Sequence, residues 1–374
     1  MKTSKEKNVQ KLISGGMILV SLAVGGVCGI LLSRNSATED GGIAVLFWQI
    51  ILLALAVFLQ IILHEAGHLV FGLLTGYRFL SFRVGSFTLQ KDADGKMRIK
   101  RFSLAGTAGQ CLMDPPDMQD GKLPYVLYNL GGILVNVLTA AVFIPLSLCT
   151  HGLLSFFFIA LGAMGVLFAL TNGLPLRMNG MPNDGYNALS LGKDREAMRA
   201  LWLQLRVNAL QTRGTRLRDM PDEWFEMPDA ESMHSPLLSA VGVFAENRML
   251  DSERFDDARQ TIALLLSIDN LIPIYRSLLT LDKVYLDVLT RGEEADVSVL
   301  TDKKMQSFCR AMRRNPTVLR TRYTVALLHD KDAVKAQTVR TQFDKIMQRY
   351  PIAADIECER MLLDDAQNKI DTTI

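Results

Sequence analysis

Two histidines and a glutamate lie within five residues of a long apolar stretch, in the order His64-Glu65-Ala66-Gly67-His68. On a helix, residues four apart project from one face one turn apart, so His64 and His68 can offer two nitrogen ligands to a single metal ion. Glu65 would flank that metal, where a carboxylate can take a proton from an activated water molecule. The residue types and their spacing predict a zinc site able to perform hydrolysis.

The apolar surroundings favour this interpretation over a purely structural role for the three residues. A pattern with only three fixed positions also arises by chance in unrelated chains. Ionisable groups at membrane depth, however, cost about 2.5–3.5 kcal/mol each on insertion scales and usually have a function. We therefore expect His64 and His68 to bind zinc and Glu65 to be the catalytic carboxylate.

The composition sets the broad class of the protein. The chain has 374 residues, enough for two domains, and its formal net charge of +2 argues against nucleic-acid binding. Its five cysteines are scattered without the paired spacing of a cysteine zinc site or a disulfide framework, so we expect free thiols.

The first half of the chain is expected to be a membrane domain, residues 1–190, with four spans. Residues 2–11 carry four lysines and place the N-terminus in the cytoplasm, and residues 76–123 form a basic loop on the same side. We expect a multi-pass protein of a cell membrane, bacterial in origin, with both termini cytoplasmic. The expected spans cover residues 12–33, 43–75, 125–148 and 153–174.

The cytoplasmic loop 76–123 contains the signature of a small β-hairpin. Residues 79–86 alternate in polarity, and Asp94-Gly95 is a turn signal followed by the segment 96–102. The free edge of such a hairpin could pair with an extended substrate backbone. Equally, the hairpin could simply lie flat on the membrane surface.

A third zinc ligand is expected from the end of the fourth span. Two histidines leave a zinc ion short of one protein ligand besides water. Asp184 follows that span and returns to the side of the membrane on which the His64 helix ends, so it is the best-placed oxygen donor. An Asp-Gly pair alone more often marks a turn, and its position makes Asp184 a predicted metal ligand.

Further polar residues lie within the expected spans. Gln60 is one turn before His64 and could either hold a zinc-binding histidine by a hydrogen bond or bond a neighbouring helix. Asn136 shares a face of the third span with Asn129, Gly132 and Thr139. That face could serve helix packing, or Asn136 could face the site and bind the substrate backbone.

The second half of the chain, residues 191–374, is expected to be a cytoplasmic soluble domain of α-helices. Helical hairpins of tetratricopeptide type could build it, although no strict repeat is visible. Such arrays present a concave surface to a protein partner, whereas a plain helical bundle need not bind anything. The expected helices cover residues 236–249, 252–268, 272–291, 300–314, 316–329, 331–349 and 352–368.

Over residues 44–190 the chain resembles the site-2 protease family of intramembrane zinc metalloproteases. The resemblance rests on the His64–His68 motif, on the glycine and asparagine of the third span, and on an Asn-x-x-Pro followed by Asp-Gly. It implies zinc ligands His64, His68 and Asp184, a catalytic Glu65, and a place near the site for Asn172. The chain departs from the family pattern in the twelve-residue separation of Asn172 and Asp184, in Asn183 where leucine is usual, and in the sequence Gly132-Ile133.

The expected function is hydrolysis of a peptide bond in or near a transmembrane segment of a membrane protein or peptide, with Zn²⁺ as cofactor. The expected partners are that substrate, the lipid bilayer and a protein on the C-terminal helices. One alternative is a membrane-anchored helical scaffold with a vestigial metal site. Another is a metal transporter, which would need ionisable ligands along several spans, and residues 12–33 offer none.

Overall fold

The computed structural model describes residues 42–92, 94–101, 108–178, 181–269 and 271–371, together with Gly15, Gly25 and Gly26. The chain is mostly helical and carries a small antiparallel sheet. The span expected at residues 12–33 lies outside the described residues apart from those three glycines.

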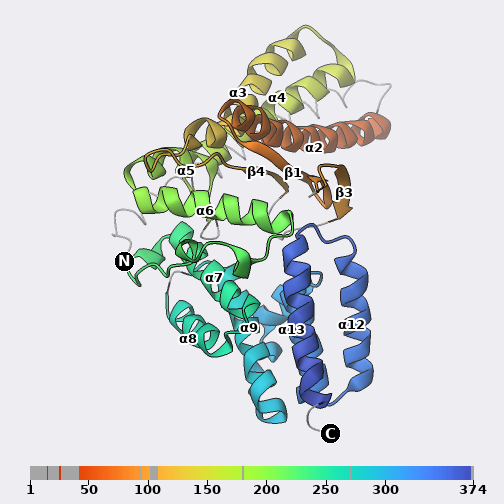
Figure 1. Ribbon diagram of the computed structural model, residues 1–374. Helices are drawn as coiled ribbons and strands as arrows, with labels where there is room; N and C mark the ends of the chain where they lie inside the picture. Colours follow the sequence, from red (N-terminus) through yellow and green to blue (C-terminus); the bar gives the residue numbers. More distant parts are fainter. Residues whose placement is uncertain are drawn as a thin grey trace.

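Three helices are long and apolar enough to cross a membrane: α2 (Gly42–Leu74), α3 (Tyr125–Leu148) and α4 (Gly152–Gly173). Their bounds match the expected spans at 43–75, 125–148 and 153–174. Large apolar side chains such as Trp48, Phe58 and Leu138 are half exposed or more, as expected for helices surrounded by lipid. Figure 1 shows the three helices together at one end of the molecule.

The helices α2 and α3 approach each other closely at two glycines. A Cβ atom on Gly67 would lie 2.3 Å from the Gly131 carbonyl oxygen, and a Cβ on Gly131 would lie 2.5 Å from the Gly67 carbonyl oxygen. Any side chain at either position would therefore push the helices apart. Because Gly67 lies between the two histidines of its helix, this contact brings α3 directly against His64 and His68.

The loop between α2 and α3 forms a four-stranded antiparallel sheet rather than the single expected hairpin. Its strands are β1 (Arg78–Val84), β2 (Phe87–Lys91), β3 (Met97–Arg101) and β4 (Gly109–Asp114), in the spatial order β3-β2-β1-β4. The Asp94-Gly95 turn joins β2 to β3, with Leu89 opposite Ile99. A second tight turn at Gly85 joins β1 to β2, and this turn splits the segment that the sequence suggested was one strand.

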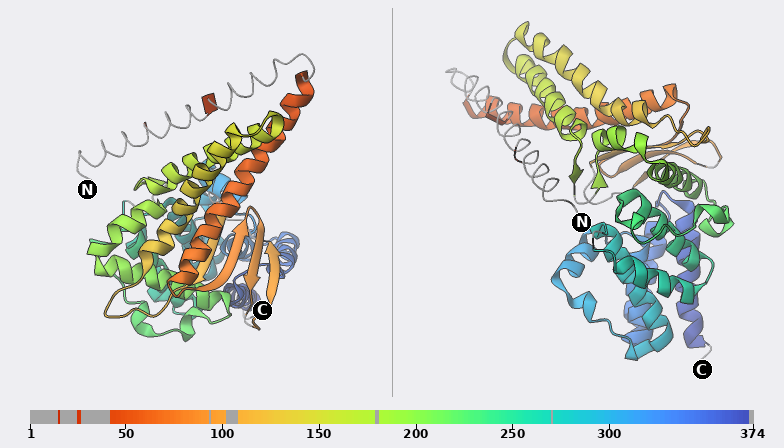
Figure 2. Two further views of the ribbon diagram at one scale, coloured as in Figure 1. Left: turned by 90° about the horizontal axis from the view of Figure 1, so that it is seen from above. Right: turned by 90° about the vertical axis from the view of Figure 1, so that its left-hand side faces the viewer.

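The sheet is sandwiched between the apolar helices and the C-terminal helices (Figure 1). Both views of Figure 2 show α2 crossing one side of the sheet. The right-hand view shows the helices of residues 191–374, here called the tail, on the opposite side. Helix α6 (Arg195–Thr212) lies directly against β4. Trp202 donates to the Pro116 carbonyl at 2.9 Å, and Arg206 and Arg213 both pair with the buried Asp114 at 2.8 Å.

One apolar core crosses the expected boundary near residue 190. Buried side chains of the sheet and of α3 share it with buried side chains of α6 and α7 (Pro236–Asp251). The sheet and the tail therefore form a continuous packed structure. The shared core contains Tyr77, Cys111, Met113, Leu123, Tyr125, Tyr128, Leu201, Leu205, Leu237 and Val241.

The tail consists of antiparallel helices, close to the segments expected from the sequence. Its last helices surround a second large core that includes Tyr285, Phe343 and Leu362. The π turn η7 (Val325–His329) directly follows helix α11, which ends at Thr324. The remaining helices are α5 (Asp184–Ser190), α8 (Phe255–Leu266), α9 (Pro273–Arg291), α10 (Lys303–Ala311), α11 (Pro316–Thr324), α12 (Ala333–Met347) and α13 (Ala353–Asp371).

Charged side chains are buried where the tail helices meet. Arg320 of α11 is fully buried, pairs with Asp282 of α9, and lies 3.3 Å from a Glu359 oxygen of α13. Close by in α13, Asp355 accepts a hydrogen bond from Gln211 of α6 at 2.9 Å. Burial, with the nearby charges of Glu359 and Asp251, raises the pKa of Asp355 to about 7.

This raised pKa predicts that the tail loses stability as pH rises. The folded chain keeps the Asp355 proton up to about pH 7, whereas an unfolded aspartate loses it near pH 4. Between these values the folded state binds more protons, so the free energy of unfolding falls by at most about 1.4 kcal/mol per pH unit for this group. Asp355→Asn should therefore have a higher midpoint temperature of unfolding than the wild type at about pH 8 but not at about pH 5, measured by thermal denaturation in detergent.

The exposed Asp256 of α8 provides the matched control. Asp256→Asn makes the same chemical change without relieving a buried charge, so its difference from the wild type should not vary with pH. A difference between Asp355→Asn and the wild type that is the same at both pH values would contradict the raised pKa.

Candidate metal centre

Three potential metal ligands converge at the junction of α2, α4 and α5. The Nε2 atoms of His64 and His68 lie 3.2 Å apart, and each lies 3.3 Å from Oδ2 of Asp184. The three atoms thus form a nearly equilateral triangle. Within the described ranges of the chain this is the one cluster of three such side chains that could hold a metal ion. Both imidazoles are buried, at 7% and 8% exposure.

The hydrogen bond of His68 to the backbone determines which of its nitrogens carries the proton. Nδ1 of His68 lies 2.8 Å from the Tyr128 carbonyl oxygen, which can only accept, so Nδ1 must donate. The neutral ring then presents an unprotonated Nε2 to the Asp184 carboxylate. Lone pairs of two acceptors facing each other at this distance repel, and a cation between them removes the repulsion.

His64 is held by a chain of two buried amides. Nδ1 of His64 lies 2.9 Å from the Asn136 amide, and the amides of Asn136 and Gln60 are 2.6 Å apart. A metal on Nε2 requires the proton on Nδ1, which then donates to the Asn136 oxygen. That arrangement turns both amide groups over relative to the structure, in which Nε2 of Gln60 donates to Oδ1 of Asn136 and Nδ2 of Asn136 faces Nδ1 of His64.

Asp184 is held in place by its neighbour Asn183. The ribbon of β5 (Arg177–Met178) and β6 (Met181–Pro182) turns the chain back toward the end of α4. There the Asn183 side chain donates to the carbonyls of Thr171 and Leu174 at 2.8 and 2.6 Å and accepts from the Tyr186 amide at 3.0 Å. The same residue therefore caps α5 and ties its first residue, Asp184, to the end of α4.

Two glycines make room for the cluster. A Cβ atom on Gly132 would lie 2.5 Å from Cε1 of His64 and 2.7 Å from Nε2 of His68. A Cβ on Gly185 would lie 2.1 Å from the Gly173 carbonyl oxygen at the end of α4. Larger residues at these positions would displace either the imidazoles or Asp184.

Glu65 lies between the metal cluster and strand β4. A Cβ on Gly109 would be 2.6 Å from Oε1 of Glu65, and the backbone amide of Cys111 donates to the Glu65 carboxylate. The buried Arg83 of β1 donates to the Gly109 carbonyl at 3.3 Å and to the Gly85 carbonyl at 3.0 Å. Arg83 thus secures the start of the strand that contacts Glu65.

The structure brings together most of the residues singled out in the sequence. Asp184 joins His64 and His68, and Gln60 and Asn136 lie behind His64, where they can orient its ring. Asn172 lies at the end of α4, where its carbonyl oxygen would be 2.9 Å from a Cβ on Gly185. Its side chain donates back to the Phe168 carbonyl at 3.0 Å within α4.

Three contributing residues were not found by sequence reasoning. Asn183 was noted only as a departure from a family pattern, although asparagine before a short helix is a typical N-cap signal that could have identified it. Tyr128 acts through its backbone carbonyl, which no sequence pattern marks. Arg83 looked like one more basic residue of a cytoplasmic loop, and only the sheet reveals its burial.

Comparison of the chain with protein-family models, with curated proteins and with solved structures gave no match.

The cluster predicts that the purified protein binds about one divalent ion and that Asp184→Ala loses most of it. Removing the carboxylate leaves two nitrogens, too few to hold a metal ion tightly. Metal content after dialysis, measured by mass spectrometry, checks this. Asp219→Asn, at an exposed position of the tail, should retain the ion. Equal metal content in Asp184→Ala and the wild type would show that the triangle is not a metal site.

The amide chain predicts that Asn136→Leu weakens metal binding by about 10–100-fold, because the His64 ring loses the partner that orients it. Gln60→Leu should act in the same direction, and the double variant should be little worse than Asn136→Leu alone. Thr139→Val is the matched control, since Thr139 lies on the same face of α3 but bonds only its own helix, at Val135. Competition with a chelator of known affinity measures all four. If Asn136→Leu and Thr139→Val bind alike, the amides do not orient His64.

Proposed function

We propose that this protein is an intramembrane zinc metalloprotease that hydrolyses a peptide bond in or near a transmembrane segment of its substrate. The observation that carries the proposal is the triangle of His64, His68 and Asp184 beside the buried Glu65, on a helix long and apolar enough to span a bilayer. Two imidazoles and one carboxylate leave room for water and substrate, as catalytic zinc sites require.

The spacing of the ligand atoms supports zinc. Zinc–ligand bonds of about 2.0–2.2 Å in a tetrahedron place the ligand atoms about 3.3–3.6 Å from one another. The separations here are 3.2 and 3.3 Å, so the triangle needs almost no rearrangement. Two imidazole nitrogens also favour zinc over magnesium or calcium, which prefer oxygen ligands.

Glu65 would move the protons of the reaction. When bound, the metal supplies Lewis acidity that polarises the scissile carbonyl and makes water more acidic. Glu65 accepts the proton of the attacking water and delivers it to the leaving amine nitrogen. The contacts of Glu65 with Gly109 and Cys111 keep its carboxylate between the metal cluster and β4.

Strand β4 is the natural place for the substrate backbone. It pairs with β1 along one side, and the described residues provide no strand on its other side. A transmembrane helix has its carbonyls bonded internally, so the substrate must unwind before attack. Pairing with β4 would hold the unwound segment extended beside Glu65, which is one of the two uses that the sequence left open for the free edge of the expected hairpin.

The exposed apolar surface supports a location in a membrane. We propose four spans, the first at residues 12–33, with both termini and the basic loop 76–123 on the cytoplasmic side. The strand registers place the exposed Phe87, Leu89 and Ile99 on the same face of the sheet as Gly109, whose Cβ would meet Glu65 of α2. They would rest against lipid, so the sheet would both lie on the membrane and offer an edge to the substrate.

Transport and scaffolding explain the arrangement less well. Helices α3 and α4 contain no histidine, aspartate, glutamate, lysine or arginine, so they offer no path of ionisable ligands for a transported ion. A scaffold with a vestigial site would need neither Glu65 against β4 nor the amides behind His64. The tail, which we propose to be tetratricopeptide-like, would select or hold the substrate through a protein-binding surface.

The test of the activity is Glu65→Gln. Glutamine keeps the size of the side chain but cannot take a proton, so metal content should match the wild type while cleavage falls by about 100-fold or more. Membrane fractions of cells carrying either form are compared by proteomics for a fragment that only the wild type produces.

Glu294→Gln makes the same chemical change at an exposed tail position and should cleave like the wild type. Unchanged cleavage by Glu65→Gln, with metal still bound, would remove Glu65 from the chemistry. No wild-type-specific fragment in any membrane fraction would favour the scaffold.

A further inference from the structure

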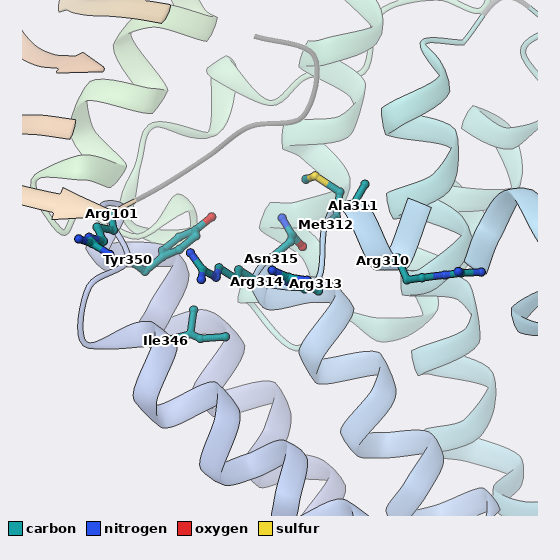
Figure 3. Close-up of a pocket in the computed structure, with 9 residues that line it drawn as sticks. All are labelled: Arg101, Arg310, Ala311, Met312, Arg313, Arg314, Asn315, Ile346 and Tyr350. Carbon is teal, nitrogen blue, oxygen red and sulfur yellow. The ribbon is translucent and has the colours of Figure 1, made fainter. Parts of the chain in front are cut away.

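A pocket of about 190 Å³ lies far from the metal cluster, at a junction of sheet and tail. It is bounded by the end of β3, by the turn between α10 and α11, and by the end of α12 (Figure 3). The Gln90 side chain of β2 donates to the Pro351 carbonyl at 2.8 Å next to this place. The pocket therefore lies where the sheet contacts the last helices of the tail.

The lining of this pocket is strongly basic. Four of its nine residues are arginines, namely Arg101 from β3 and Arg310, Arg313 and Arg314 from the α10–α11 segment, and none is an aspartate or glutamate. Figure 3 shows the Arg314 side chain extending toward the Tyr350 ring, with Arg101 on the other side of that ring. All four side chains are exposed, and Figure 3 shows Arg310 extending away from Arg314, so an anion at the pocket would meet chiefly the other three.

The four pocket arginines lack the carboxylate partners that several arginines of the tail have. Arg206, Arg216, Arg248 and Arg320 each pair with an aspartate. In contrast, the described part of the chain provides no carboxylate partner for any of the four pocket arginines. Arg101 does lie over the Phe87 ring, at 5.2 Å from its centroid, but no carboxylate of the described residues balances the four charges.

The donors and the walls fit a phosphate group with a carbon substituent. A guanidinium offers parallel N–H groups that match two oxygens of a phosphate, and several together match a dianion. Ile346 and Tyr350 form the apolar wall of the same pocket and could contact the carbon part of the ligand. Asn315 also lines the pocket and caps the first turn of α11, whose positive end adds to the potential.

We propose that this pocket is a phosphate-binding site that fastens strand β3 to the α10–α11 turn of the tail. The phosphate belongs either to a soluble phosphate compound or to a lipid headgroup, and both offer the same group to the arginines. This proposal is independent of the activity at the metal cluster. Because Arg101 comes from the sheet and the other arginines come from the tail, the ligand would tighten their junction.

The experiment measures binding to the full chain, purified in a non-ionic detergent, by titration calorimetry. Inorganic pyrophosphate is the soluble probe, and dihexanoyl phosphatidic acid is the lipid probe. At least one of them should bind saturably, with an affinity that falls as salt is added. Tighter binding of pyrophosphate supports a soluble ligand, and tighter binding of phosphatidic acid supports a headgroup.

The variant Arg313→Ala/Arg314→Ala should raise the dissociation constant by about tenfold or more, because it removes charge-assisted hydrogen bonds. Arg291→Ala/Arg360→Ala removes the same charge from exposed tail positions outside the pocket and should bind like the wild type. If the first variant does not fold, as judged by circular dichroism, Arg101→Ala tests the site from the sheet side.

Three results would overturn the proposal. These are the absence of saturable binding by both probes, equal binding by the wild type and the pocket variants, and an equal loss in the Arg291→Ala/Arg360→Ala control. The last would show that only general charge attracts the probes.

Discussion

Three acceptor atoms that face one another at hydrogen-bond distance form the centre of this structure. Nε2 of His64, Nε2 of His68 and an oxygen of Asp184 repel one another when all three present lone pairs, and a cation among them removes that repulsion. The surrounding structure serves this arrangement. The contact of Gly67 with Gly131 brings α3 against the histidines, Gly132 leaves them room, and Asn183 fastens α5 to the end of α4.

The sequence predicted the metal cluster better than it predicted the surroundings. Helical spacing suffices to place His64 and His68 on one face, and chain direction suffices to return Asp184 to them. The link between Gln60, Asn136 and His64 depends on the rotation of α3 against α2, which spacing within one helix cannot reveal. For this reason the alternatives of helix packing and substrate binding for Asn136 both remained open until the structure placed its amide beside His64.

The sheet was underestimated for a different reason. Strand β2 is five residues long and only two residues separate it from the end of β1, so the two strands and their turn at Gly85 resemble one alternating segment. Strand β4 lies in the second half of the loop 76–123, where no strand was expected from the sequence. What matters for the site is that β4, the least evident strand, is the one that contacts Glu65.

The apolar core shared by the sheet, α3 and α6 has a practical meaning for dissecting this protein. A chain ended near residue 190 would expose the faces of Tyr77, Met113 and Leu123 that α6 and α7 now cover, and it would leave Asp114 without its two arginines. Because of these exposed apolar faces, such a truncated chain would be expected to aggregate, whatever the role of the tail. Point substitutions that preserve the fold are therefore the better way to distinguish the function of residues 1–190 from that of residues 191–374.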